Sequence, residues 1–111
     1  MNKYLVTGGA GFIGSHVVDA LVARGEAVRV VDDLSTGKRE NLADHEKVEF
    51  IEHDLATPGV ASRVVDGVSH VVHVAAIPSV PRSVEDPVGT HRANVDATLL
   101  LLMAARAAKV K

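Results

Sequence analysis

Cysteine is absent from the 111-residue sequence, so the chain has neither a disulfide framework nor a thiolate metal site. Aromatic residues make up only 3%, which argues against a stacking platform for single-stranded nucleic acid. The net charge of −2 does not predict a nucleic-acid partner or an anionic membrane surface. The longest apolar run, residues 99–105, is too short to cross a bilayer, and MNKYLVTGG lacks the features of a secretory signal. These absences predict a cytoplasmic globular protein.

Apolar residues make up 47% of the chain, enough for the core of one domain, which we place at residues 1–111. Apolar runs of strand length alternate with segments whose apolar residues recur at helical spacing. Strands are predicted at residues 4–7, 28–31, 48–51 and 69–76, and helices at 13–24, 59–65 and 87–108. We expect Asp86 to cap the last helix, a polar loop with one helical turn at 34–47, and an irregular loop at 77–87. The alternation predicts a parallel α/β sheet with right-handed crossovers.

Four glycines fall within seven residues in VTGGAGFIGSHVV, where the first strand should meet the first helix. Gly8, Gly11 and Gly14 are spaced three apart, so backbone amides at a helix N-terminus are open to a phosphate group. A tight turn without a ligand would use the same residues. Asp32 ends the second strand, where a carboxylate accepts hydrogen bonds from a ribose 2′-OH and repels a 2′-phosphate. Together the two features predict a dinucleotide site, and the lack of a following Gly-Lys-Ser/Thr excludes a P-loop.

TGGAGFIGSH, VVDDLSTGKREN, HDL, HVAA and RANVDAT occur in this order along the chain. In these motifs the sequence resembles the extended short-chain dehydrogenase/reductase superfamily, and within it the NAD-dependent nucleotide-sugar epimerases and dehydratases, most of all those similar to UDP-glucose 4-epimerase. The resemblance implies a Rossmann-type, doubly wound parallel sheet of spatial order 3-2-1-4, truncated after about four strands. It also implies NAD as cofactor and transient oxidation of a sugar at C4 by that NAD.

The resemblance implies a set of cofactor-binding residues. The pyrophosphate would lie against Gly8, Gly11, Phe12, Ile13 and Gly14, and the adenosine end against Asp32, Asp33, Leu34, Ser35 and Gly37. Adenine would lie against Asp54 and Leu55, and the nicotinamide side against Val74, Ala75, Ala76 and Ile77, with Asn94 supporting that loop. Residues 79–83 would begin the sugar-nucleotide pocket.

Several of these residues have a plainer interpretation. Asp54 could cap a loop, Asn94 could face water, and the serines at 79 and 83 could be turn residues. Lys38 and Arg39 could meet a 2′-phosphate, but Asp32 on the strand end favours NAD over NADP. His70 and His73 are three apart, which places them on opposite faces of a strand, so no metal site is predicted. His73 is expected to be packed or to line the cleft.

Members of the family act through a Tyr-x-x-x-Lys pair with a serine or threonine. The only tyrosine, Tyr4, is followed by Leu-Val-Thr, so we assign no catalytic residue. We therefore expect the NAD-binding, N-terminal part of an epimerase that acts on a nucleotide sugar and is a homodimer when intact, with no nucleic-acid or membrane partner. A 4,6-dehydratase or reductase of the same family, or a non-catalytic dinucleotide-binding module, is the alternative.

Overall fold

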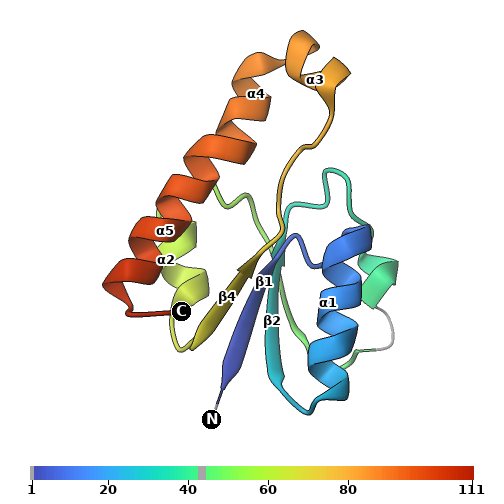
Figure 1. Cartoon of the computed structure of the whole chain (residues 1–111), viewed down its shortest axis with the longest axis vertical. Helices are drawn as coiled ribbons and strands as arrows, with labels where there is room; N and C mark the ends of the chain where they lie inside the picture. Colours follow the sequence, from blue (N-terminus) through green and yellow to red (C-terminus); the bar gives the residue numbers. More distant parts are fainter. Residues whose placement is uncertain (1, 43–44) are drawn as a thin grey trace.

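The computed structural model describes residues 2–42 and 45–111 and contains a parallel sheet (Figure 1). Its strands are β1 (Lys3–Thr7), β2 (Ala27–Asp32), β3 (Glu49–Glu52) and β4 (His70–His73). They lie in the order β3-β2-β1-β4, which confirms the predicted sheet. All pairs are parallel, with Val6 opposite both Val30 and Val72. The carboxyl ends of the strands therefore meet at one edge of the sheet.

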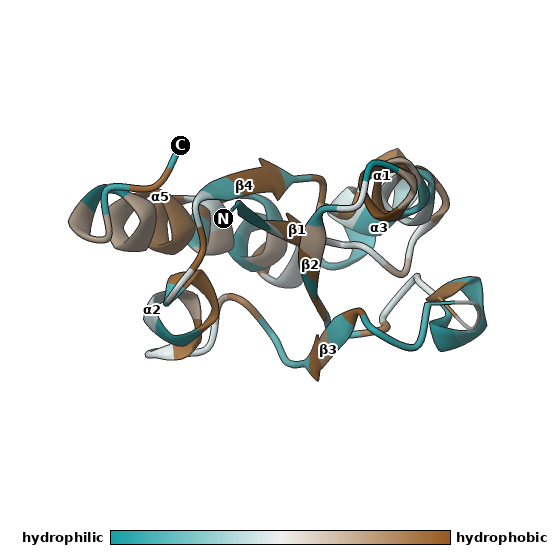
Figure 2. Ribbon diagram, turned by 90° about the horizontal axis from the view of Figure 1, so that it is seen from below, coloured by the Kyte–Doolittle hydropathy of each residue, from teal (hydrophilic) through white to brown (hydrophobic). Residues whose placement is uncertain are grey.

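Helices cover both faces of this sheet (Figure 2). On one face lies α1 (Phe12–Ala23), and on the other lie α2 (Val60–Val65) and α5 (Ala97–Ala107). Successive side chains of β1 point to opposite faces, so Leu5 belongs to the core cluster under α2 and α5, and Val6 to the cluster under α1. The resulting three-layer arrangement is the doubly wound architecture that the sequence predicted. Within the part that the structure describes, none of the helices combines the length and the apolar character of a membrane span.

The fourth strand is shorter than the predicted range of 69–76. Its pairing with β1 ends at His73, opposite Thr7. Thr7 is the last residue of β1, because Gly8, which follows it, has a φ of +68° and turns the backbone away from β4. Residues 74–76 continue beyond the sheet without a strand beside them. Of the predicted polar loop at 34–47, the helical turn is the 3₁₀ segment η1 (Arg39–Leu42), and residues 43 and 44 lie outside the described residues.

The prediction of an irregular loop at 77–87 was wrong. Residues in this range form α3 (Val80–Glu85), whose first amides are capped by Ser79, with Oγ accepting from the Arg82 N–H at 3.3 Å. Pro81 misled the prediction, because proline is tolerated in the first turn of a helix, where its missing N–H has no partner to lose.

The helix predicted at 87–108 is divided into three segments. They are α4 (Pro87–His91), the π-helical stretch η2 (Arg92–Asp96) and α5. Asp86 caps α4 as predicted, its carboxylate accepting from the Gly89 N–H at 3.0 Å. In Figure 1, α3 and α4 project beyond the carboxyl ends of the strands, while α5 lies along the sheet.

Arg29 on β2 joins the sheet to the end of α2. Its Nη1 donates to the carbonyl oxygens of Val64 and Asp66, both at 2.7 Å, and its Nε donates to Glu49 at 3.0 Å. Carbonyls at a helix C-terminus have no intrahelical partner, so the guanidinium satisfies groups that would otherwise depend on water. Hydrogen bonds from Lys3 and then Arg29 lower the pKa of Glu49.

We predict that Arg29→Ala lowers the free energy of unfolding by about 2 kcal/mol, because charge-assisted hydrogen bonds of a side chain only 12% exposed are lost. The matched control is Arg24→Ala, whose side chain is 66% exposed and lies 3.8 Å from Glu26. That change should cost less than about 0.5 kcal/mol. Urea denaturation followed by circular dichroism measures both, and equal losses would contradict the prediction.

Candidate dinucleotide-binding site

The turn after β1 brings α1 against the end of the sheet. Gly8 has a positive φ, and a Cβ on it would lie 2.8 Å from the Ala75 Cα. At Gly14 a Cβ would lie 2.0 Å from the Gly8 carbonyl oxygen, so only glycine allows the helix to pack this closely. Gly11 is the N-cap of α1, and no described side chain caps the helix. The first amides of α1 therefore remain available to an anion.

The carboxylate of Asp32 is held in a fixed position at the end of β2. One oxygen accepts from the Ala10 N–H at 3.0 Å and the other from the Leu34 N–H at 2.8 Å. Each carboxylate oxygen can accept a further hydrogen bond, so a hydroxyl group of a ligand still finds an acceptor here. The two backbone contacts preorganise this acceptor beside the glycine turn.

The loop after β2 folds back onto the glycine turn. The Ala10 carbonyl oxygen accepts from the Lys38 N–H at 3.0 Å and from Asn41 Nδ2 at 2.7 Å. A Cβ on Gly37 would lie 2.8 Å from the Ala10 carbonyl carbon, so the loop packs against this peptide with no room for a side chain. Ala10 thus links α1, Asp32 and the loop.

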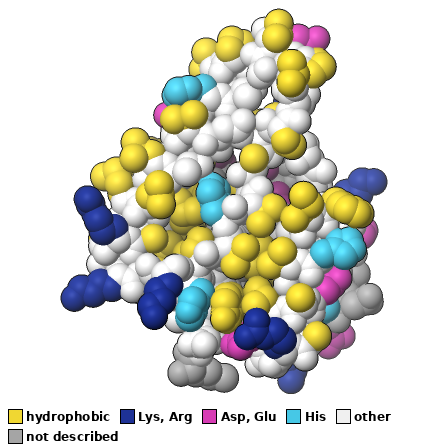
Figure 3. All heavy atoms as spheres, in the orientation of Figure 1, with side chains coloured by type: hydrophobic (Ala, Val, Ile, Leu, Met, Phe, Trp, Pro, Cys, Tyr) yellow, Lys and Arg dark blue, Asp and Glu magenta, His cyan; other side chains and the backbone are white. Residues whose placement is uncertain are grey.

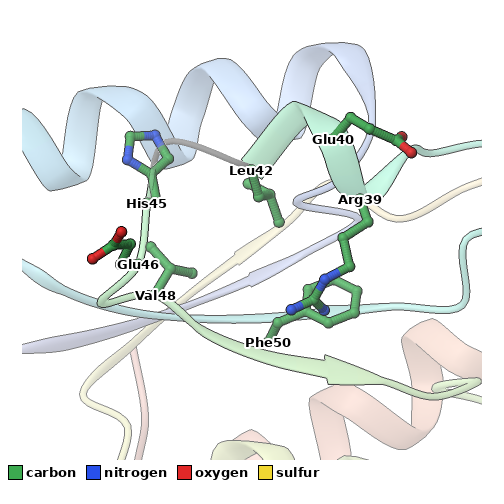
Figure 4. Close-up of a pocket in the computed structure, with 7 residues that line it drawn as sticks. All are labelled: Arg39, Glu40, Leu42, His45, Glu46, Val48 and Phe50. Carbon is green, nitrogen blue, oxygen red and sulfur yellow. The ribbon is translucent and has the colours of Figure 1, made fainter.

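Arg39 lies outside the cleft. Its guanidinium sits 4.2 Å from the ring centroid of Phe50, in a separate hollow that these two residues line together with Leu42, Val48 and others (Figure 4). A cation over an aromatic face is held by the ring quadrupole. Of the two cationic residues that follow Asp32 in the sequence, Lys38 and Arg39, the second is therefore held away from the Asp32 carboxylate.

The wall opposite the glycine turn follows β4. Thr7, fully buried at the end of β1, accepts from the Val74 and Ala75 N–H groups at 3.0 and 3.1 Å. Asn94 holds Ile77 twice, with Oδ1 accepting from its N–H at 2.7 Å and Nδ2 donating to its carbonyl at 3.1 Å. This wall is therefore fixed at both ends. Sequence reasoning missed Thr7, whose only signal is a polar residue in a buried apolar strand.

Most of the predicted residues line one cleft of about 250 Å³. Those that the structure brings together are Gly8, Gly11, Phe12, Ile13, Gly14, Asp32, Asp33, Ser35, Leu55, Val74, Ala75, Ala76 and Ile77. Thr36, Pro78, Ala93 and Ala97 also line it and were not predicted. Their chemistry gave no signal, because small and apolar residues are found in any loop or helix.

Four predicted residues do not line this cleft. Leu34 and Gly37 support it through the loop contacts described above, and Asn94 supports it from η2. Asp54 accepts from the Ala56 N–H at 2.9 Å and pairs with Arg92 at 3.3 Å, which is the loop-capping arrangement.

The two serines of the predicted sugar-nucleotide segment make local contacts. Ser79 caps α3, and Ser83 Oγ donates to the Val80 carbonyl at 2.6 Å. Both contacts lie within a single helix, so they account for the serines without a ligand.

A parallel sheet whose first strand passes through a glycine turn into a helix N-terminus, with a carboxylate ending the neighbouring strand, defines a Rossmann-type dinucleotide-binding fold. The chain belongs to the NAD dependent epimerase/dehydratase family, whose sequence model matches residues 4–111. The UDP-glucose 4-epimerase of Mycolicibacterium smegmatis is 44% identical over 113 residues, covering 98% of this chain and 36% of that protein.

Solved structures of family members superpose closely. The NAD complex of Thermus thermophilus UDP-glucose 4-epimerase has a TM-score of 0.90 and 47% identity, covering 98% of this chain and 35% of that one. The NAD-bound dTDP-glucose 4,6-dehydratase of Streptomyces venezuelae has a TM-score of 0.89 and 38% identity, covering 97% and 37%. The chain thus spans about a third of the length of these relatives.

We predict that Gly14→Ala lowers the free energy of unfolding by about 2 kcal/mol or more, because the new methyl group overlaps the Gly8 carbonyl and forces α1 off the sheet. Gly11→Ser is the control, since the nearest atom to a Cβ there is 3.3 Å away and serine is a favourable N-cap. It should change stability by less than about 1 kcal/mol. Thermal and urea melts measure both, and a Gly14→Ala protein as stable as the control would refute the close-packing argument.

Proposed function

We propose that this chain is the NAD-binding part of a nucleotide-sugar epimerase similar to UDP-glucose 4-epimerase. The observation that carries the proposal is the single cleft in which the uncapped N-terminus of α1 faces the same space as the Asp32 carboxylate. When bound, NAD supplies a hydride acceptor for transient oxidation of the sugar at C4. The chain's own residues bind and orient that cofactor.

The residues of the cleft fit a dinucleotide. At Gly11 a side chain would fill the space in front of the first amides of α1, so its absence lets a pyrophosphate reach the N–H groups of Phe12 and Ile13. Asp32 accepts from the adenosine ribose and repels a 2′-phosphate. Arg39, which could have balanced that phosphate, is stacked on Phe50. These features support NAD over NADP.

A 4,6-dehydratase reaction is the second candidate, because the Streptomyces dehydratase shares the fold over nearly the whole of this chain. The product distinguishes the two when the gene's full reading frame is expressed and supplied with UDP-glucose or dTDP-glucose. Inversion at C4 alone supports the epimerase, whereas a 4-keto-6-deoxy sugar supports the dehydratase and overturns the first proposal.

The proposal includes a nucleotide sugar as substrate, a homodimer and a cytoplasmic location. Leu99, Leu102 and Met103 on α5 are each more than half exposed, and Figure 3 shows hydrophobic side chains gathered over this helix. Apolar surface of this kind is covered when copies of a chain associate.

We expect Leu102→Glu to lower the dimer fraction of the full-length protein in analytical ultracentrifugation, and an unchanged fraction would argue against α5 as the interface.

We predict that Gly11→Ser and Asp32→Asn each weaken NAD binding about tenfold, which corresponds to the loss of one charge-assisted contact. The serine side chain occupies the space through which the phosphate would reach the first amides of α1. The asparagine removes the negative charge that repels a 2′-phosphate, so Asp32→Asn should also narrow the preference for NAD over NADP. Isothermal titration calorimetry with NAD and NADP measures both effects. Asp66→Asn, at the exposed end of α2, is the control and should leave NAD affinity unchanged. Full affinity in folded Gly11→Ser and Asp32→Asn proteins would refute the proposed site.

A further inference from the structure

A chain of hydrogen bonds runs through His73 at the end of β4. Thr7 Oγ1 has three partners, of which the N–H groups of Val74 and Ala75 can only donate. The third partner is His73 Nδ1 at 2.6 Å. The hydroxyl proton of Thr7 therefore goes to Nδ1, which must be unprotonated.

The other side of the imidazole gives the same answer independently. Thr98 Oγ1 lies 2.8 Å from the Asn94 carbonyl oxygen, which can only accept, so the Thr98 proton points there. His73 Nε2, at 2.9 Å from the same Oγ1, must then donate. Both threonines thus require one state of His73, the neutral imidazole with its proton on Nε2.

This chain of hydrogen bonds begins and ends on the wall of the cleft. At one end Thr7 holds the amides of Val74 and Ala75, and at the other Asn94 holds both backbone groups of Ile77. His73 is the link between the two, because it contacts Thr7 on β1 and Thr98 on α5, and Thr98 in turn donates to the Asn94 carbonyl.

We propose that His73 is a positioning residue, which as the neutral Nε2–H tautomer fixes the Val74–Ile77 wall for dinucleotide binding, and that its protonation loosens this wall and weakens binding. The inference rests on the proposed NAD site and adds to it a dependence on pH.

Protonation would place a second donor, Nδ1–H, against Thr7 Oγ1. The two lone pairs of Thr7 Oγ1 would then face three N–H donors, those of Val74, Ala75 and His73 Nδ1. The hydroxyl proton of Thr7 would at the same time lose its acceptor. One of the wall amides must give up its contact, or the imidazole must move. His73 is exposed at the end of β4, and the desolvation of its partly covered ring lowers its pKa. The lowered pKa favours the neutral form, so protonation requires a more acidic pH than for an ordinary histidine.

Other titratable groups lie on the elements around His73, and most of them have partners of their own, among them Lys3, which pairs with Glu49. On the strands and helical segments around it, these groups are Lys3, Tyr4, His70, His91, Arg92, Asp96 and Arg106. Tyr4 stacks on His70, and among the described residues the ion pairs of η2 and α4 join Arg92 to Asp54 and His91 to Asp96. Among the described residues, the side chains that hydrogen-bond to the His73 ring are the uncharged hydroxyl groups of Thr7 and Thr98.

The first test uses the unmodified chain labelled with ¹⁵N. We expect His73 Nδ1 to show the shift of an unprotonated imidazole nitrogen, and the amide signals of Val74 and Ala75 to move together with the titration of His73. Protonation of Nδ1 at neutral pH would overturn the inference, whether or not NAD binds. The same holds if the amide signals of Val74 and Ala75 do not shift as His73 is protonated.

The second test follows NAD affinity by calorimetry from about pH 7.5 down to about pH 4.5, so that the series extends below the ordinary histidine range, because the pKa of His73 is lowered. We expect affinity to fall about fivefold or more as the pH is lowered, a coupling of ordinary size. His73→Asn should abolish this dependence, because its amide oxygen can accept from Thr7 near the position of Nδ1 but cannot be protonated. Thr7→Ser keeps the hydroxyl group and should therefore keep the pH dependence of NAD affinity.

His16→Asn and His53→Asn are the matched controls, since both histidines are exposed near the cleft and are not part of the chain of hydrogen bonds. Both variants should keep the pH dependence of the unmodified chain. A dependence that survives in His73→Asn, or disappears in a control, would overturn the role of His73. Failure of the unmodified chain to bind NAD at any pH would instead refute the proposed function.

Discussion

The close approach of α1 to the end of β1 is the constraint on which the rest of the site depends. Gly14 lies so near the Gly8 carbonyl that no side chain fits between them. This packing aims the first amides of α1 at the edge of the sheet where the strands end. It also fixes Ala10, whose N–H and carbonyl position the Asp32 carboxylate and the loop that follows it. A backbone contact thus places the groups for both the proposed phosphate contact and the proposed ribose contact.

The two sides of the cleft are held by different means. The side proposed for adenosine is organised by backbone groups of Ala10 and Leu34 around a carboxylate. The side proposed for nicotinamide is organised by the side chains of Thr7 and Asn94 acting on backbone groups. Thr7 is fully buried and needs every partner satisfied, so the second side depends on correct proton positions in a way that the first does not.

Periodicity predicted the parallel sheet, α1 and α2, and the glycine spacing predicted the turn between β1 and α1, because these depend on patterns within a few residues of sequence. The strand order and most of the residues that line the cleft came instead from the family resemblance. The helix α3 was missed because Pro81 is compatible with a loop and with a first helical turn. Thr7 was not assigned to the site, and for His73 the prediction went no further than a packed or cleft-lining residue, because their contact joins residues 66 positions apart. The assignment of Asp54 to the adenine stays a prediction, and the contacts that the structure gives Asp54 are those of a loop cap and an ion pair.

The π-helical stretch separates two parts of what would otherwise be one continuous helix. On its far side α5 buries Ala97, Leu101 and Ala104 in the core, whereas α4 buries none of its residues. The wider turn between them changes the angular phase of the helix, so α5 keeps its packing face while Arg92 and Asn94 reach Asp54 and Ile77. Because α3 and α4 bury none of their residues, sequence drift there can change the surface beyond the carboxyl ends of the strands while the hydrophobic interior is left undisturbed.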